Sequence, residues 1–311
     1  MRIVNQNAIL LEHSRDDPYG FIEDVARTCY KSEAKKTPDS ALKMVQNLIK
    51  SSHLAMLEHE YVFFKVDSIA LSMLISDYGV NNLKYINFDY PYVSASFRAL
   101  LELYNNTKSK MDFAFEVAGE LFYQLCQKYP DIFPQIPEPK TRFKIELLSR
   151  EEILEKYKGR SASLIIPHTI RFTTSRAISH ELVRHRVASF AQESQRYVAY
   201  DQDKHGSQIE IINPLIDPSD IENYNAWHYA MIMAETQYMN LRKNGIKPEI
   251  ARGVLPNDCK TEIVITATET EWQHILNLRL HGTTGAPHPQ MKQLMELAYP
   301  ILVAESEGRL K

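Results

Sequence analysis

Arginine, hydroxyl and amide side chains are concentrated in one segment of the chain, His180–Val198, which reads HELVRHRVASFAQESQRYV. Its potential donors to a ligand are Arg184, Arg186, Ser189, Gln192, Ser194 and Arg196. Arginine holds phosphate through two parallel hydrogen bonds, and hydroxyl and amide groups suit the polar edge of a base. The alternative, a salt-bridged amphipathic helix with a polar loop, is disfavoured by this density of donors and by the flanking Phe190, Tyr197 and Tyr200. The segment therefore predicts a nucleotide-binding site.

We expect residues 175–187 to form a helix that carries the first part of this segment. At about 100° per residue, Glu181, Arg184 and His185 fall on one face of such a helix. Arg186 falls on the opposite side, so the two arginines should contact different partners.

Several common kinds of site are excluded by spacing. HELVRH resembles the zinc motif H-E-x-x-H, but His180 and His185 would lie about 140° apart around a helix, whereas paired zinc ligands need a spacing of four. We therefore expect no metal. The sequence contains no nucleophile elbow, Walker loop or G-x-G-x-x-G motif. With ten glycines in the chain, a nucleotide should be held mainly by side chains and helix ends.

The composition is that of a globular protein. The chain has 311 residues and a net charge of −3, which argues against a nucleic-acid polymer as partner. Its three cysteines, Cys29, Cys126 and Cys259, are too few for a disulfide scaffold or a cysteine-rich zinc site. No apolar run reaches the roughly 18 residues of a membrane helix, and the first residues lack the apolar core of a signal peptide. We expect a cytoplasmic protein that does not bind a membrane.

Helices and a few strands follow one another without the βαβ rhythm of a doubly wound sheet, which predicts an α+β fold. Strands are expected within residues 2–12 and at 60–66, 169–174 and 261–266. Helices are expected at 17–30, from about 38, and at 175–187, 218–245, 247–255, 269–280 and 289–305. Residues from about 67 to 168 carry few potential catalytic groups, and we interpret them as an inserted, largely helical subdomain. The chain is then a single catalytic domain, residues 1–311, interrupted by this insertion.

The segment Arg184–Tyr197 resembles the signature of flavin-dependent thymidylate synthases, in which Arg-His-Arg precedes a serine and a polar stretch ending in Ser-x-Arg-Tyr. Other segments resemble the family's remaining motifs in the same order. These are Ala26–Tyr30, His53–His59, Ala251–Pro256 and Leu278–Arg279. The resemblance covers about residues 1–66 and 169–300, so the insertion lies outside it.

This resemblance implies an α+β fold assembled as a homotetramer, with FAD and dUMP bound where subunits meet. It implies the reductive methylation of dUMP to dTMP, with 5,10-methylenetetrahydrofolate as carbon donor and NADPH as reductant through the flavin. The residues it implies for dUMP are Glu181, Arg184, Gln192, Glu193, Ser194, Gln195, Arg196, Arg252 and Arg279. Those it implies for FAD are Ala55, Arg184, His185, Arg186, Val187, Gln192, Thr268, Glu269, Thr270 and His274. The expected catalytic residues are Arg279, Ser194 and His53, the last of which matches a residue near the flavin ring.

The sequence departs from the family pattern at three places. Ala55 stands where the family usually has a hydroxyl, which puts in question one hydrogen bond to the flavin that the resemblance implies. Thr268 replaces a common asparagine, and Ala191 and Gln192 replace the Asn-Glu pair of some members. None of these changes removes an arginine that would hold a phosphate.

Methylation at C5 of uracil requires that carbon to become nucleophilic. An enzyme cysteine added to C6 would need neighbours that lower its pKa, and Cys259 has an adjacent lysine but no histidine nearby in the sequence. We therefore favour the mechanism that the resemblance implies, in which the flavin transfers hydride and carbon and the enzyme stabilises charge. Arg279 would stabilise an enolate-like uracil at its N3 and O2 edge. Arg196 and Arg252 would anchor the nucleotide, and Ser194 would orient it.

Two other classes of protein could use the same arginines. A non-catalytic nucleotide- or RNA-binding module would contain no flavin and would be basic overall, which the net charge of −3 disfavours. A different flavin enzyme, such as a reductase without a dUMP site, is disfavoured because Arg252 and Arg279 are retained. Flavin content and dUMP binding separate these three classes.

Overall fold

The structure is a computed structural model that describes residues 1–12, 17–78, 85–108, 113–196, 200 and 208–311. Its helices are α1 (Pro18–Tyr30), α2 (Ser40–Lys50), α3 (Ser68–Tyr78), α4 (Phe97–Thr107), α5 (Phe113–Lys128), α6 (Arg150–Tyr157), α7 (Arg176–Leu182), α8 (Ile221–Lys243), α9 (Pro248–Ala251), α10 (Glu269–Arg279) and α11 (Pro289–Glu305). Its strands are β1 (Arg2–Val4), β2 (Asn7–Leu10), β3 (Tyr61–Val66), β4 (Ile86–Asp89), β5 (Tyr92–Ser96), β6 (Ile145–Leu148), β7 (Pro167–Ser175), β8 (Ser189–Gln192), β9 (Glu210–Ile212) and β10 (Lys260–Thr268). The α+β class is confirmed.

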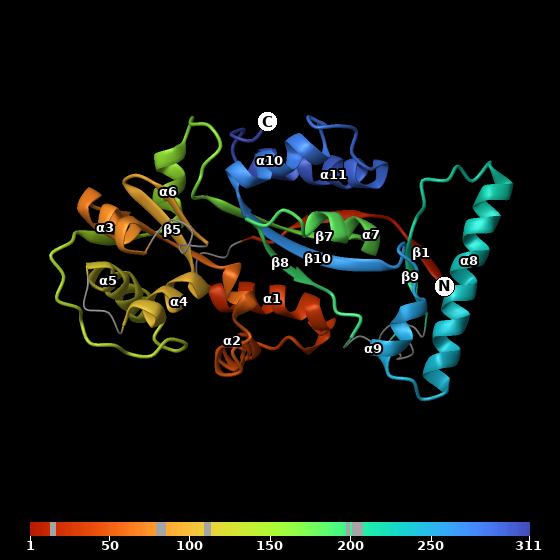
Figure 1. Cartoon of the computed structure of the whole chain (residues 1–311), viewed down its shortest axis with the longest axis horizontal. Coiled ribbons are helices and arrows are strands. Elements are labelled where there is room, and N and C mark those ends of the chain that lie inside the picture. Colours follow the sequence, from red (N-terminus) through yellow and green to blue (C-terminus); the bar gives the residue numbers. More distant parts are fainter. Residues whose placement is uncertain (13–16, 79–84, 109–112, 197–199, 201–207) are drawn as a thin grey trace.

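A central antiparallel sheet with the strand order β2-β7-β10-β8 lies between two layers of helices (Figure 1). Side chains of successive strand residues point to opposite faces, so β10 contributes to both cores. Ile263 and Ile265 pack with α7, α10 and α11, whereas Val264 packs with Phe21 and Val25 of α1 on the other face. The sheet thereby fixes the positions of α7 and α10, which carry much of the predicted site.

The inserted region forms a second sheet in addition to its helices. The strand order is β4-β5-β3-β6, so β3, one of the two inner strands, comes from the chain before residue 67. Sequence patterns did not reveal the strands β4, β5 and β6. Buried residues of α1 and α2 share one hydrophobic core with α3, α4 and α5 through Ile22, Val45, Leu74, Leu100 and Leu121. The insertion is therefore packed against the N-terminal helices through a common core.

At the other end of the molecule, α8 and α9 pack beside the parallel pair of β1 and β9 (Figure 1). Tyr238 and Met231 are the buried residues of α8, and they share a small core with Cys259 and Ile211. Among the helices of the described ranges, none combines the length and the apolar character that crossing a membrane requires.

Helix α11 permits a direct test of the packing on the central sheet. Leu294 of this helix is fully buried against the central sheet, whereas Leu297 of the same helix is 39% exposed. We expect Leu294→Ala to lower the free energy of unfolding by roughly 2–5 kcal/mol, because it removes buried methyl groups and leaves a cavity. Leu297→Ala should change it by less than about 0.5 kcal/mol. Urea denaturation of both variants measures the difference, and equal losses would contradict this packing.

Candidate active site

Helix α7 ends at Leu182, five residues before the expected end at Val187. Residues 183–188 form turns, in which His185 N donates to Leu182 O at 3.1 Å and Ala188 N donates to His185 O at 3.1 Å. The prediction that Arg184 and Arg186 lie on opposite sides of a helix is therefore wrong. Both arginines line one cavity.

This cavity has a volume of about 570 Å³ and lies between the end of α7, the turn that follows it, α10 and the loop before α11. The predicted site residues that line it are Glu181, Arg184, His185, Arg186, Val187, His274 and Arg279. Three arginines and the two carboxylates Glu181 and Glu271 line it. The excess of guanidinium groups makes the cavity suitable for an anionic ligand.

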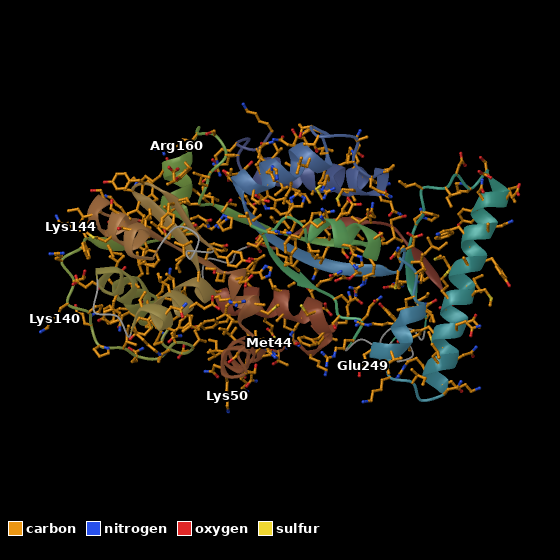
Figure 2. The ribbon with its side chains drawn as sticks, viewed as in Figure 1. Met44, Lys50, Lys140, Lys144, Arg160 and Glu249 are labelled. Carbon is orange, nitrogen blue, oxygen red and sulfur yellow. The ribbon has the colours of Figure 1, made fainter. Side chains whose placement is uncertain are left out.

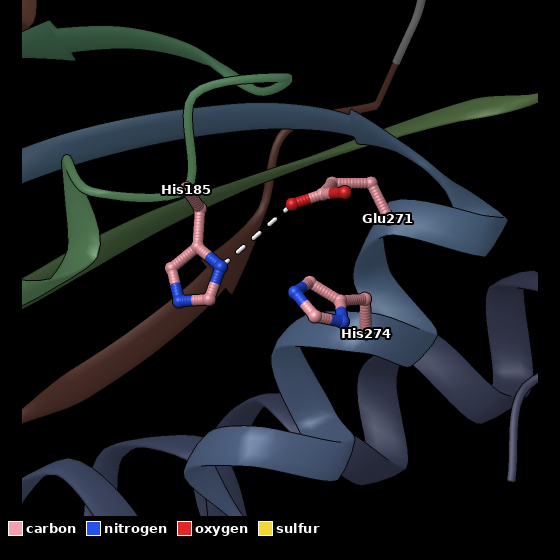
Figure 3. Close-up of side chains that lie close together, drawn as sticks. All are labelled: His185, Glu271 and His274. Atoms are coloured by element: carbon pink, nitrogen blue, oxygen red, sulfur yellow. Dashed lines mark ion pairs between the residues drawn. The ribbon is translucent and has the colours of Figure 1, made fainter.

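Arg279, the last residue of α10, is held by α7 and the turn after it. Its Nη1 donates to Glu181 Oε2 at 2.8 Å, and its Nε donates to His185 Nε2 at 3.2 Å. Because a guanidinium N–H can only donate, the proton of a neutral His185 ring lies on Nδ1. That nitrogen faces Glu271 Oε1 at 3.7 Å (Figure 3). The guanidinium group is thus oriented before any ligand arrives.

Sequence reasoning missed Glu271 as well as the loop residues Thr284 and His288, all of which line the cavity. Helical spacing could have revealed Glu271, because residues 271, 274 and 278 share one face of a helix. The loop carries no comparable periodic signal.

A second group of predicted residues, Ser194, Gln195, Arg196 and Arg252, lies outside this cavity. Ser194 N donates to Cys29 O at 3.0 Å, which joins the segment after β8 to the end of α1. Arg196 Nε lies 3.8 Å from Oε2 of Glu249, which is labelled on α9 in Figure 2. Arg252 is exposed directly after α9. The predicted phosphate anchors therefore gather near α9 and apart from Arg279, and Tyr197 of the same motif lies outside the described residues.

Two predicted ligand residues before Ser194 make contacts within the protein. Gln192 Nε2 donates to Ser179 Oγ at 2.7 Å. Glu193 is 2% exposed, and its Oε2 accepts from Glu262 N at 3.1 Å and Lys260 Nζ at 3.4 Å. These contacts fix the backbone that leads to Ser194.

His53 and Ala55 line another cavity, of about 390 Å³, together with Cys29, Tyr30 and Arg98. Cys29 joins this cavity to Ser194 through the backbone hydrogen bond described above. His53 and Ala55 thus lie with the second group rather than with Arg279.

The predicted flavin stretch Thr268–Thr270 lies at the far end of β10, away from the cavity lined by Arg279. Glu269 is fully buried, and its carboxylate accepts from Arg309 Nη2 at 2.8 Å and Ser163 N at 2.8 Å. His168 Nε2 lies 2.9 Å from the same carboxylate. In this chain Glu269 therefore holds together three separate segments.

None of the three cysteines has an environment that favours the thiolate. Burial raises the pKa of Cys29 and of Cys259 to about 11 and that of Cys126 to about 12. Gln195 Nε2 and Tyr200 Oη contact Cys259 Sγ at 3.5 Å and 3.8 Å. They do not offset the cost of burying the charge.

Residues 142–305 match the family model described as thymidylate synthase complementing protein, and this is more than half of the chain. The protein belongs to that family, which confirms the resemblance seen in the sequence.

Two curated relatives are flavin-dependent thymidylate synthases of Pyrococcus. The chain is 34% identical to the Pyrococcus furiosus protein over 134 residues, which cover 42% of this chain and 54% of the relative. It is 38% identical to the Pyrococcus abyssi protein over 106 residues, which cover 34% and 43%. The chain spans about half the length of the curated relatives it matches.

One solved structure, a UMP/dUMP methylase PolB from Streptomyces cacaoi bound with 5-Br dUMP, covers 99% of each chain, with a TM-score of 0.41 and 15% identity. Nothing about the ligands of the present chain follows from a similarity at this level.

We expect Glu269→Gln to lower the free energy of unfolding by roughly 3–5 kcal/mol, because it removes the buried carboxylate that pairs with Arg309 and leaves only the exposed Glu307 beside that guanidinium group. Glu271→Gln, two residues away, is the matched control and should cost less than about 1 kcal/mol, since Glu271 lies at the cavity wall. Chemical denaturation compares the two variants. If the Glu269 variant is as stable as the Glu271 variant, the buried ion pair of Glu269 with Arg309 does not stabilise the fold.

The acidic groups around Lys260 predict a pH dependence of stability. Burial alone would raise the pKa of Glu262, but Lys260 and Lys31 lower it to about 2. Its folded pKa is below the ordinary value of 4.5, so its contribution to stability is complete above about pH 5 and is lost as the pH falls toward 2. The Glu262→Gln variant should be less stable than the wild type at pH 6. Between pH 5 and pH 2 it should lose less stability than the wild type does. Urea midpoints across that range measure both slopes, and parallel slopes would refute this coupling.

Proposed function

We propose that this protein is a flavin-dependent thymidylate synthase, which methylates dUMP to dTMP with 5,10-methylenetetrahydrofolate as carbon donor and NADPH as reductant. The observation that carries the proposal is the cavity in which the Arg-His-Arg segment meets Arg279, in a chain of the thymidylate synthase complementing family. The net charge of −3 counts against a nucleic-acid polymer as the substrate. We also propose that the reaction takes place in the cytoplasm.

The side chains that line the Arg279 cavity have the hydrogen-bond donors that FAD requires. Arg184 and Arg186 offer planar guanidinium groups for a diphosphate, and the rings of His185 and His274, whose centroids are 5.9 Å apart, offer a partly apolar wall. Of the other predicted flavin residues, Ala55 and Thr268–Thr270 do not line the cavity that contains Arg279. When bound, FAD would supply hydride transfer and carry the one-carbon group.

Arg279 would stabilise the developing negative charge on uracil. Glu181 and His185 hold its guanidinium group in place, so little reorganisation is needed when charge appears at N3 and O2. With all three thiols shifted away from ionisation, we propose that no enzyme cysteine adds to C6.

The predicted anchors Ser194, Arg196 and Arg252 do not line the cavity that contains Arg279. We propose that the single catalytic domain assembles as a homotetramer, in which anchors from one subunit complete the cavity of another. The separation of the two groups supports this arrangement, because one nucleotide needs both a phosphate anchor and a contact to its base.

Absorption spectroscopy of the purified protein tests the proposed function. A flavin spectrum should be present or should be restored by added FAD, and dUMP should perturb it, because both ligands are proposed to share one site. Formation of dTMP should require both NADPH and methylenetetrahydrofolate. If the protein binds dUMP but cannot be loaded with FAD, the proposed function is wrong.

Substitutions at two arginines should separate chemistry from binding. Arg279→Lys keeps the charge but loses the planar fork, so we expect a loss of roughly 2–4 kcal/mol in kcat/KM for dUMP, seen in kcat as well. Arg196→Lys should mainly raise KM, because a phosphate anchor binds the ground state and the transition state alike. Steady-state kinetics with flavin occupancy measured in parallel gives both values. Wild-type turnover by the Arg279 variant would exclude its role at the uracil.

A further inference from the structure

Three side chains at the wall of the Arg279 cavity point toward one another (Figure 3). His185 comes from the turn after α7, and Glu271 and His274 come from α10. One ligand atom from each, a ring nitrogen or a carboxylate oxygen, lies within 4.8 Å of the other two. Glu271 and His274 form a Glu-x-x-His pair one helical turn apart, a spacing that places both groups on one metal in helical metal sites.

The donor set selects a class of ion. Two imidazole nitrogens and one carboxylate suit Zn²⁺ and similar divalent transition metals, whereas Mg²⁺ and Ca²⁺ prefer oxygen ligands throughout. The cavity of about 570 Å³ beside these residues leaves room for water as a further ligand.

We propose that His185, Glu271 and His274 bind one zinc-class divalent ion in the flavin-free protein, and that this ion and FAD exclude each other. The metal site depends only on this chain's own donors. The exclusion rests on the proposed function, because His185 and His274 are the same rings that are predicted to contact the flavin.

The hydrogen bonds of His185 set a condition on metal binding. Its Nδ1 faces Glu271, and its Nε2 accepts from Arg279 Nε at 3.2 Å. A metal at Nδ1 moves the ring proton to Nε2, where Arg279 can no longer donate. Arg279 would then keep its contact to Glu181 alone. Its positive charge, together with those of Arg184 and Arg186 at the same cavity, would oppose the ion, whereas Glu181 and Glu271 would favour it.

Arg279 is therefore a competitor of the metal, and this yields an unusual expectation. Removing its guanidinium group with Arg279→Ala should tighten metal binding by about tenfold or more, even though the same variant loses the proposed uracil contact. Removing a ligand with Glu271→Gln or His274→Asn should weaken it by at least about tenfold, since loss of an outer-sphere partner alone costs that much.

The experiment is a Co²⁺ titration of the full chain stripped of flavin, followed by its visible ligand-field bands and by displacement with Zn²⁺. We expect one saturable equivalent, with bands that indicate nitrogen ligands. His288→Asn is the matched control, because His288 lines the same cavity outside the ligand set and asparagine can replace it as the cap of α11. This control should bind Co²⁺ as the wild type does.

The outcomes separate the two proposals. No saturable Co²⁺ binding by protein that still takes up FAD overturns the metal site alone. Co²⁺ binding by protein that cannot take up FAD supports the metal site and overturns the proposed function. Unchanged binding in the His274 variant, or equal loss in the His288 variant, shows that the ligand set is wrong. Simultaneous binding of Co²⁺ and FAD with unaltered affinities overturns the exclusion.

Discussion

The antiparallel pairing of β7 with β10 is the constraint on which the Arg279 cavity depends. The ladder runs from the pair Ser175 and Lys260 to the pair Pro167 and Thr268, so the helices that follow the two strands start at opposite ends of it. Both α7 and α10 pack on the same face of the sheet and run back along it toward each other. Their combined 18 residues extend about 27 Å, and the ladder extends about 30 Å. The two C-terminal ends consequently meet, and Glu181 contacts Arg279 there.

The elements with strong local signals could be predicted from the sequence. Helix α11 begins at Pro289 and ends at Glu305 as expected, because proline favours the first turn and a regular apolar stripe follows. Helix α7 was predicted five residues too long, since neither glycine nor proline marks its end at Leu182. The strands β4 to β6 are only four or five residues long and were read as part of a helical region. Strands of this length give little periodic signal.

The candidate site shows the same division between local and long-range information. The resemblance located the cavity residues from Glu181 to Val187 together with His274 and Arg279. It could not reveal that Glu269 pairs with Arg309, because that contact joins residues 40 positions apart. A carboxylate at the start of a helix has the same local sequence whether it holds a ligand or a buried arginine. Only the packing of the C-terminal segment distinguishes the two.

The sequence separation within the central sheet has a consequence for the order of folding. The core on one face of β3 is built from residues between 19 and 147, and the core that contains its Phe63 extends only to Ile166. The core around β10 instead combines Ala8 with residues as late as Leu310. Closing long loops carries an entropic cost before the contacts they permit are gained. On a ribosome the insertion and its sheet can therefore pack while β10 has yet to be made, whereas the edge of β7 that pairs with β10 must wait for it. The inserted region, which carries few potential catalytic groups, would then be the first to become structured. Pulse-labelled hydrogen exchange on nascent chains can establish this order.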